Sequence, residues 1–297
     1  MKLPEFLVGP VHVRTVLRTL AALAVMGAIG AVLVVGLGLY NVSAKTGHFP
    51  GVSWILHTTF RNSVHLRADA SPPETLGDAD MIALGAGHFD DACRMCHAAP
   101  GETRSATVRA MVPEPPPIAE AVKDWKPHEL HWIVHKGIKM SGMPHWPATR
   151  EDDVWPVVAF LLAADGMSAE DYARLTERPG GKYCAMCHGI DGVSDNRHVP
   201  RLDILSEQYI ADSLRAYRDG QRDSGIMAQA VGHLSDSAVP GVAATFSDTT
   251  PRGQADPAGP QEERGRSLAT ATGPSDVPAC RACHGPWPEP LNPAFPS

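Results

Sequence analysis

The sequence predicts a mainly α-helical protein in which one N-terminal transmembrane helix precedes a tandem array of small helical domains. Two observations support this fold class. An uncharged, largely apolar run of 22 residues extends from Thr19 to Tyr40, and a helix of this length crosses a bilayer core. A Cys-x-x-Cys-His motif then occurs three times, and its first cysteines, Cys93, Cys184 and Cys280, lie 91 and 96 residues apart. This regular spacing indicates one repeat per motif.

The N-terminal region divides into a cytoplasmic segment, residues 1–18, and a membrane anchor, residues 19–40. Lys2, Arg14 and Arg18 precede the apolar run, and positive charge on this side keeps the N-terminus in the cytoplasm. A cleaved signal peptide is the alternative, because small residues follow the run at positions 42–44. The apolar core of a signal peptide normally spans only about 7–15 residues. We therefore expect an uncleaved, single-pass anchor.

Residues 41–75 form a connecting segment with aromatic and aliphatic side chains among polar ones, including Trp54, Phe60 and Val64. These side chains belong either at the level of the lipid headgroups or on the apolar side of a short helix that rests on the next domain. The sequence leaves both interpretations open.

All six cysteines of the chain belong to the three motifs, and a histidine directly follows each pair. Two thiols three positions apart can add to the two vinyl groups of one haem, while the adjacent histidine ligates the iron. Because no cysteine is left for a zinc site or a disulfide, we expect covalently bound haem c. Such attachment takes place outside the bacterial cytoplasm. The predicted thioether and iron ligands are Cys93, Cys96, His97, Cys184, Cys187, His188, Cys280, Cys283 and His284.

The first repeat, residues 76–166, has a predicted helix before its motif, at 81–92, and two after it, at 127–136 and from 151 to about 164. Between these last two lies a loop with Gly137, Gly142 and Pro144, residues that can shape a turn able to press a thioether onto a metal. The candidates for the sixth iron ligand are Met143, Met140, His131 and His135.

The second repeat, residues 167–248, has predicted helices at 169–183 and 206–219. Met227 is the only methionine between His188 and the C-terminus. As a soft ligand for haem iron it is the predicted sixth ligand, with His198 and His233 as rivals. Pro200 follows His188 by a dozen residues, and it either offers its carbonyl to the histidine ring or simply forms a turn.

The end of the second repeat, about residues 234–246, is predicted to close the domain poorly, because Pro240 interrupts any long helix there. A linker rich in proline and glycine follows, residues 249–261. It leads to a partial third repeat, residues 262–297, with an expected helix at about 262–269.

The third repeat departs from the first two. Only 13 residues follow His284, and no methionine follows Met227, whereas Met143 and Met227 lie 46 and 39 residues beyond their motif histidines. We therefore expect two to three haems. The third site is explained by a truncated reading frame, by completion from another polypeptide, or by an exposed high-spin haem.

These motifs resemble the class I cytochrome c fold, and more narrowly the membrane-anchored multiheme cytochromes c of bacterial respiratory chains. The first methionine loop, 137–144, is similar to the ligand loop of class I cytochromes c, and this resemblance favours Met143 over Met140. The stretch from Cys187 through 220–222 to Met227 and 234–236 is similar to the repeated unit of tandem diheme cytochromes c. Residues 39–44, with His48, Trp54 and 63–64, resemble the segment next to the membrane. The resemblance implies tandem cytochrome c domains, at 76–166 and 167–248, and a role as an electron carrier.

The predicted function is therefore single-electron transfer by a cytochrome c in the bacterial inner membrane, with its haem domains in the periplasm. The expected partner is a periplasmic or membrane redox protein, such as an oxidase, a quinol-oxidising complex or a dehydrogenase. The alternatives are the cytochrome subunit of a membrane-bound dehydrogenase for alcohols, aldehydes or sugar acids and, more remotely, a haem peroxidase. A formal net charge of −7 argues against nucleic acid as a partner. No catalytic residues are expected in this chain.

Overall fold

The computed structural model of the chain describes residues 12–139, 141–247, 259–271, 277–285 and 295. It divides into two units, Met1–Gly51 and Val52–Ser297. The part of the chain so described is helical, and its single isolated β-bridge joins Ile138 to Met143. The predicted mainly α-helical class is confirmed.

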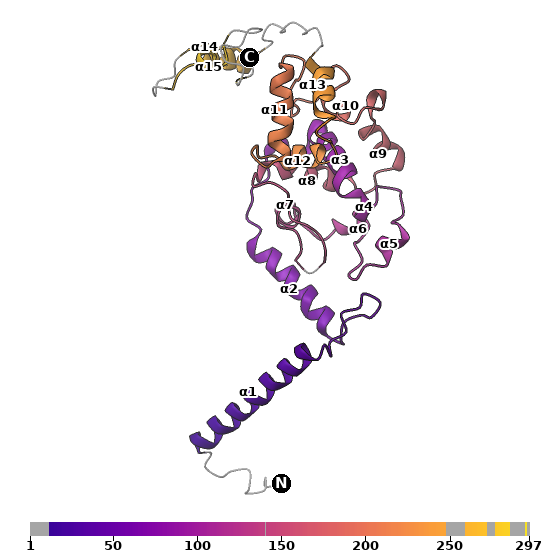
Figure 1. Cartoon of the computed structure of the whole chain (residues 1–297), viewed down its shortest axis with the longest axis vertical. Helices are drawn as coiled ribbons and strands as arrows, with labels where there is room; N and C mark the ends of the chain where they lie inside the picture. Colours follow the sequence, from indigo (N-terminus) through magenta and orange to yellow (C-terminus); the bar gives the residue numbers. More distant parts are fainter. Residues whose placement is uncertain (1–11, 140, 248–258, 272–276, 286–294, 296–297) are drawn as a thin grey trace. The chain divides into compact units, whose positions relative to one another are not determined.

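The first unit consists of one long helix, α1 (Val13–Gly36), and a short C-terminal extension (Figure 1). This helix has a mean hydropathy of 2.3, and by length and composition it can cross a membrane. None of its described residues is buried. In the extension, the hydroxyl of Tyr40 lies 2.7 Å from Nδ1 of His48, and the Tyr40 ring packs edge-on against Phe49.

The second unit begins with a helix, α2 (Val52–Arg67), that packs on the first hydrophobic core. Val64 of α2 is fully buried, its neighbour His65 lies 2.5 Å from the carboxylate of Glu129, and Phe60 packs edge-on against Trp125. Of the two interpretations of this segment, the structure supports the helix that rests on the next domain. The elements from α2 to α9 are α2 (Val52–Arg67), η2 (Glu74–Gly77), α3 (Ala79–Ala92), α4 (Arg94–His97), α5 (Ala106–Arg109), α6 (Ile118–Ala121), α7 (Pro127–Lys136), η3 (Asp152–Val154), α8 (Trp155–Ala163) and α9 (Ala169–Leu175).

The first hydrophobic core is built on the crossing of α3 and α8. The two helices approach so closely that a Cβ on Gly85 would lie 1.8 Å from the carbonyl oxygen of Pro156, so the crossing requires glycine. Beside it, the rings of Phe89 and Phe160 pack with their centroids 4.9 Å apart, and both side chains are almost completely buried. Close packing of this kind holds α3, which ends at the first motif, in a fixed position.

Helix α9 also belongs to this first core, although it follows the expected boundary between the repeats at residue 166. Tyr172 is buried against Phe89 and Phe160, and its hydroxyl donates a hydrogen bond of 2.9 Å to Asp90. The Asp90 carboxylate also pairs with Arg94 and with Arg178, at 2.7 and 2.9 Å. One carboxylate thus ties the first motif to the segment that enters the second.

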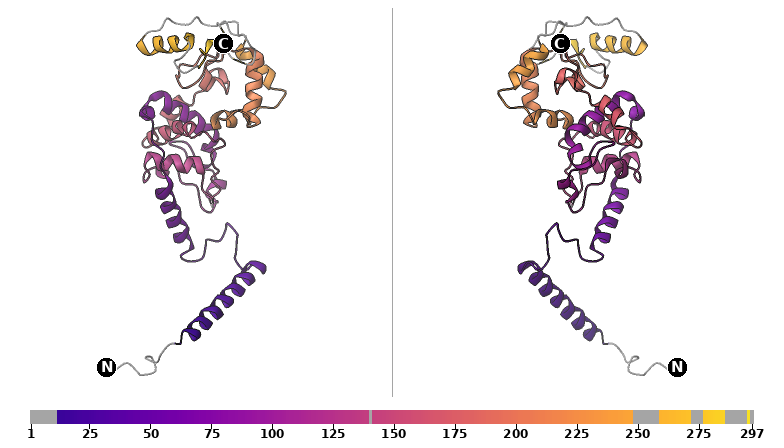
Figure 2. Two further views of the ribbon diagram at one scale, coloured as in Figure 1. Left: turned by 90° about the vertical axis from the view of Figure 1, so that its left-hand side faces the viewer. Right: turned by 90° about the vertical axis from the view of Figure 1, so that its right-hand side faces the viewer.

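The second core lies between α11 and α13, which run side by side in the views of Figures 1 and 2. Its buried side chains include Ile210, Leu214, Val239 and Phe246. Pro240 does not interrupt the closing helix, contrary to expectation, because it stands in the first turn of α13, where a proline removes no helical hydrogen bond. The elements here are η4 (Pro179–Gly181), α10 (Ala185–His188), α11 (Glu207–Arg218), α12 (Gly225–Val231) and α13 (Val239–Ser247).

The described part of the third repeat contains two helices, α14 (Pro260–Thr270) and α15 (Arg281–His284). Neither helix contains a buried residue. Most of the linker at 249–261 and of the tail after Gly285 lies outside the described residues.

Candidate haem-binding sites

The three Cys-x-x-Cys-His motifs adopt the same backbone conformation. Each histidine donates its backbone N–H to the carbonyl of the first cysteine, and the N···O distance is 3.0 Å in all three motifs. The motif residues thereby form the one-turn helices α4, α10 and α15. In such a turn the two cysteines, three positions apart, lie on one side, as attachment to one porphyrin requires.

The residue after each histidine reverses the chain with a positive φ. Gly189 and Gly285 have φ values of 76° and 70°, and Ala98 takes the same position in the first motif with φ 56° and ψ 162°. This region of backbone conformation is almost restricted to glycine, because a Cβ is crowded there. Alanine at position 98 therefore stores backbone strain.

The first two motif histidines are oriented by proline carbonyls. Nδ1 of His97 lies 2.9 Å from the carbonyl oxygen of Pro116, and Nδ1 of His188 lies 3.1 Å from that of Pro200. A carbonyl only accepts, so Nδ1 is the donor, and Nε2 keeps the lone pair that can ligate iron. The interpretation of Pro200 as an acceptor is confirmed. The role of Pro116 was missed, although it stands in a proline-rich run that the sequence displays.

Burial keeps these two imidazoles neutral. It lowers the pKa of His97 and of His188 below the ordinary value of 6.5, and the hydrogen bonds to Pro116 and Pro200 only partly oppose this effect. Burial also raises the pKa of the Cys93 thiol to about 12 and that of Cys187 to about 11. Neutral imidazole is the ligating form, so the local environment suits coordination.

The first methionine loop is built on glycines with positive φ. Gly137, at φ 65°, follows α7, and a Cβ on it would lie 2.6 Å from the carbonyl of Pro144. The β-bridge between Ile138 and Met143, with an N···O distance of 3.1 Å, closes the loop. Met143 is half-buried. Met140 lies outside the described residues.

The two histidine rivals in the first repeat make other contacts. Nε2 of His131 lies 2.7 Å from the backbone carbonyl of Glu151, and its ring stacks on Trp155. His135 is buried and lies 3.7 Å from the Glu151 carboxylate. Both rings therefore have partners at the start of the last helix of the first repeat.

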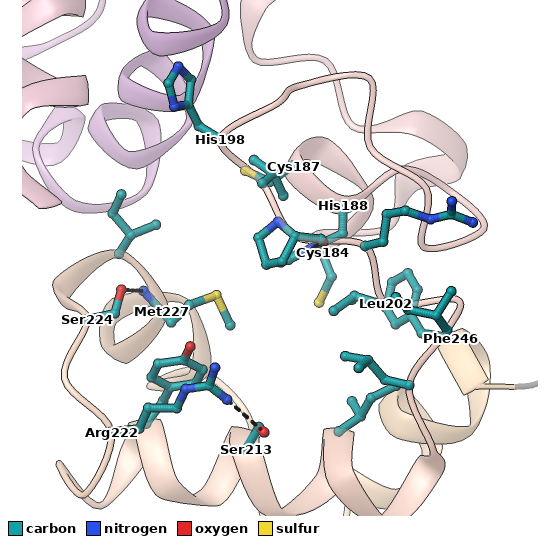
Figure 3. A pocket seen from close by; sticks show the side chains of 18 of the residues that line it. Cys184, Cys187, His188, His198, Leu202, Ser213, Arg222, Ser224, Met227 and Phe246 are labelled. Carbon is teal, nitrogen blue, oxygen red and sulfur yellow. Dashed lines mark hydrogen bonds between the residues drawn. The ribbon is translucent and has the colours of Figure 1, made fainter. Parts of the chain in front are cut away.

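The second site is a large cavity that brings the predicted ligands together. Cys184, Cys187, His188 and Met227 all line one space of about 1590 Å³. Figure 3 shows the thioether of Met227 pointing into this space, with Cys184 and His188 on another side of it. The volume exceeds the usual range of about 300–1,000 Å³ for a small-molecule site, and Cys280 and His284 of the third motif contribute to the same lining.

The walls of this cavity are apolar on one side and cationic on another. Leu202, Leu214 and Phe246 provide apolar surface. Arg222 enters from the loop after α11, where its guanidinium donates to the Ser213 hydroxyl at 3.0 Å and lies over the Tyr217 ring. A cavity of this composition accommodates a flat apolar group that carries carboxylates at one edge.

Of the two histidines that are the alternative sixth ligands of the second repeat, one does not point toward the Met227 thioether and the other lies outside the cavity lining. His198 is exposed, and in Figure 3 its ring points away from the Met227 thioether, although it borders the cavity. His233 is exposed and lies 3.5 Å from the carboxylate of Asp91, outside the cavity lining.

Comparisons with known proteins agree with this geometry. The sequence model of the family described as "Cytochrome C oxidase, cbb3-type, subunit III" matches residues 80–161. The "Thiosulfate dehydrogenase electron acceptor" of Thiomonas intermedia is 36% identical over 112 residues, which are 36% of this chain and 52% of that protein. "Cytochrome c4" of Pseudomonas aeruginosa is 33% identical over 108 residues, 35% of this chain and 51% of that protein.

A smaller relative is covered more completely. "Cytochrome c-554(548)" of Halomonas halodenitrificans is 39% identical over 67 residues, which are 22% of this chain and 81% of that protein. This chain spans about half the length of the two larger relatives. No solved structure matches it significantly.

Proposed function

This chain belongs to the cytochrome c family, and on that premise we propose that it carries single electrons between redox proteins on the periplasmic side of a bacterial inner membrane. The observation that carries the proposal is the second cavity, which is lined by Cys184, Cys187, His188 and Met227 together. A covalently bound haem supplies reversible one-electron chemistry when held in this way.

The residues of the second site fit such a group. Two thiols stand on one turn of helix, the imidazole is neutral with Nε2 available, and a thioether borders the same cavity. Histidine and methionine together favour a low-spin iron with a raised reduction potential. The Pro200 carbonyl fixes the ring of His188.

The first site is proposed to hold a haem in the same manner, with Cys93, Cys96 and His97 on one side and Met143 on the other. Its support is the shared motif conformation, the Pro116 carbonyl on His97 and the glycine-shaped loop around Met143. The chain therefore carries two sites with histidine and methionine ligands.

A third haem at Cys280, Cys283 and His284 is proposed on the motif and its one-turn helix alone. Met143 and Met227 are assigned to the first two sites, so the third site would have a different sixth ligand or an open position. An open position permits binding of small ligands to the iron.

A dehydrogenase is the electron donor that the relatives favour. The relative from Thiomonas intermedia is named an electron acceptor of thiosulfate dehydrogenase, and we propose that this chain likewise receives electrons from a dehydrogenase and passes them toward an oxidase. The net charge of −7 suits docking to a partner with a basic patch around its own cofactor.

The test is the intact mass and the optical spectrum of the full chain, produced with the haem-maturation machinery. We expect mass increments for two or three covalent haems. We also expect a methionine-to-iron charge-transfer band whose intensity is about half that of the wild type in each of the single variants Met143→Leu and Met227→Leu. Thiosulfate dehydrogenase with its substrate should then reduce the protein. Colourless protein, or haem lost to acidified acetone, would overturn the proposal. Turnover of peroxide by the wild-type protein would instead indicate a peroxidase.

A further inference from the structure

The helix that carries Met227 is capped by a carboxylate from the other haem domain. Asp153 belongs to η3, in the first repeat, yet its side chain lies at the start of α12. One carboxylate oxygen, Oδ2, accepts hydrogen bonds from the backbone nitrogens of Gly225 and Ile226, at 2.6 and 3.3 Å. The first N–H groups of a helix have no partner within the helix, so Asp153 satisfies two donors that would otherwise be left to solvent.

The same contact continues to the methionine itself. Oδ2 of Asp153 also accepts a hydrogen bond of 3.1 Å from the hydroxyl of Ser224, and this hydroxyl in turn accepts from the backbone nitrogen of Met227 at 3.3 Å. Ser224 is buried. A continuous chain of hydrogen bonds therefore runs from the first repeat to the backbone of the predicted iron ligand.

A second contact holds the same segment. Trp146, three residues after Met143, is buried against Gly225 so closely that a Cβ on residue 225 would lie 2.1 Å from the indole Nε1. Nearby, the backbone nitrogen of Thr149 donates to the carboxylate of Asp223 at 2.9 Å. The segment after Met143 thus contacts the segment before Met227 at three places, through Trp146, Thr149 and Asp153.

We propose that Asp153 is a positioning residue for Met227, so that the first haem domain sets the sixth iron ligand of the second. This inference rests on the proposed function, in which Met227 ligates the second haem. The carboxylate fixes the start of α12, and α12 is a short helix that points its Met227 thioether into the cavity (Figure 3). Without the carboxylate, the first turn of α12 loses its charged acceptor and the thioether becomes easier to displace.

The experiment compares Asp153→Ala and Asp153→Asn with the wild type in the full, haem-loaded chain. In Asp153→Ala we expect the apparent affinity of one haem for added imidazole to rise about tenfold, which is the scale of one hydrogen bond to a charged group. The reduction potential of the same haem should lie below that in Asp153→Asn, which lacks the same charge but keeps an acceptor, because methionine ligation raises the potential. The other haem should keep its potential.

Asp153→Asn separates positioning from charge. The amide oxygen can still accept from α12, so ligation and imidazole affinity should stay near those of the wild type, while loss of the negative charge should raise the potential. Asp152→Ala is the matched control, because the exposed Asp152 side chain bonds to Arg150 and not to α12. It should behave as the wild type.

Two results would overturn the inference at different levels. If Asp153→Ala lowers the unfolding temperature but has the same potentials as Asp153→Asn and the imidazole affinity of the wild type, Asp153 is only structural, and the proposed function stands. If the wild-type protein itself lacks a methionine-to-iron band from the second haem, the ligand assignment fails, and this inference fails with it. Covalent haem content, measured by mass, shows that each variant has matured.

Discussion

At the scale of single residues, the turn after each motif histidine shows how strictly the fold limits one backbone position. Ala98, Gly189 and Gly285 share a positive φ and an extended ψ. Only the first motif places a Cβ there. Strain of this kind costs about 1–3 kcal/mol, and the loss of one buried methyl group in a change to glycine offsets part of the gain.

We expect Ala98→Gly to raise the free energy of unfolding by up to about 1 kcal/mol. The reverse change in the second motif, Gly189→Ala, should lower it by at least about 2 kcal/mol, because the new Cβ would also lie 2.2 Å from the carbonyl oxygen of Val193. Chemical denaturation followed by the haem absorption measures both. Equal signs for the two variants would contradict this explanation.

His88 is a buried titratable residue whose environment predicts a pH dependence. Burial lowers its pKa from 6.5 to about 4, and Asp91 acts in the opposite direction. The folded state therefore binds fewer protons than the unfolded state between about pH 4 and pH 6.5, so stability is complete above pH 6.5 and falls as the pH drops through this window. The loss amounts to about 3 kcal/mol.

The prediction is tested by urea denaturation at a series of pH values for the wild type and His88→Gln. The variant should lose most of the decline in unfolding free energy between pH 6.5 and pH 4. His57→Gln is the control, because the His57 side chain is exposed, and it should keep the wild-type slope. A wild-type slope in His88→Gln would show that another group titrates.

At the scale of the elements, the sequence predicted the helices best where local signals mark both ends. Helix α7 spans Pro127–Lys136 as expected, since a proline opens it and Gly137 ends it. Helix α9 ends at Leu175 rather than near Tyr183, because Pro179 and Gly180 begin a separate turn. Haem attachment was predictable for the same reason, because each Cys-x-x-Cys-His motif is a local signal of five consecutive residues.

The first methionine loop provides a prediction at this scale. In Gly137→Ala the new Cβ would meet the carbonyl of Pro144 at 2.6 Å, in addition to the strain of a positive φ. We expect the loop to shift and the methionine-to-iron band to fall by about half, since one of two methionine ligands is affected. Gly166→Ala is the matched control, with φ 78° and nothing within 4 Å of its Cβ.

Optical spectra of the two variants check this prediction. Gly166→Ala should lose some stability from strain alone and keep the full band. If both variants keep the full band, the Gly137 turn does not determine the position of Met143.

At the scale of the whole molecule, the sequence could not reveal how the repeats join. Asp153 and Gly225 are 72 positions apart, and Asp90 and Arg178 are 88 apart. No local pattern marks such pairs, because an acidic residue at the start of a helix is equally explained by its own helix dipole. The third repeat shows the opposite case. Its motif is evident from the sequence, but the described helices around it, α14 and α15, contain no buried residue.

The membrane anchor is tested on the whole chain. No described residue of α1 is buried, and an apolar helix of this length can span the hydrocarbon core of a bilayer. We expect the full chain to stay in the membrane fraction after alkaline carbonate washing. A chain that starts at residue 41 behind a cleavable leader should be released into the periplasm with the same haem content. Release of the full chain by carbonate, or its maturation to a shorter mass, would show that the helix is a signal peptide.

The place of α9 bears on how such a protein can be rebuilt or inherited. The repeats expected from the sequence, 76–166 and 167–248, divide before α9, yet Tyr172 of this helix packs against Phe89 and Phe160 in the first core. A gene divided at that boundary would give an upstream domain that lacks Tyr172 and leaves Phe89 and Phe160 partly uncovered. The domain that can be duplicated or exchanged intact therefore extends past the first sequence repeat, residues 76–166, and includes α9.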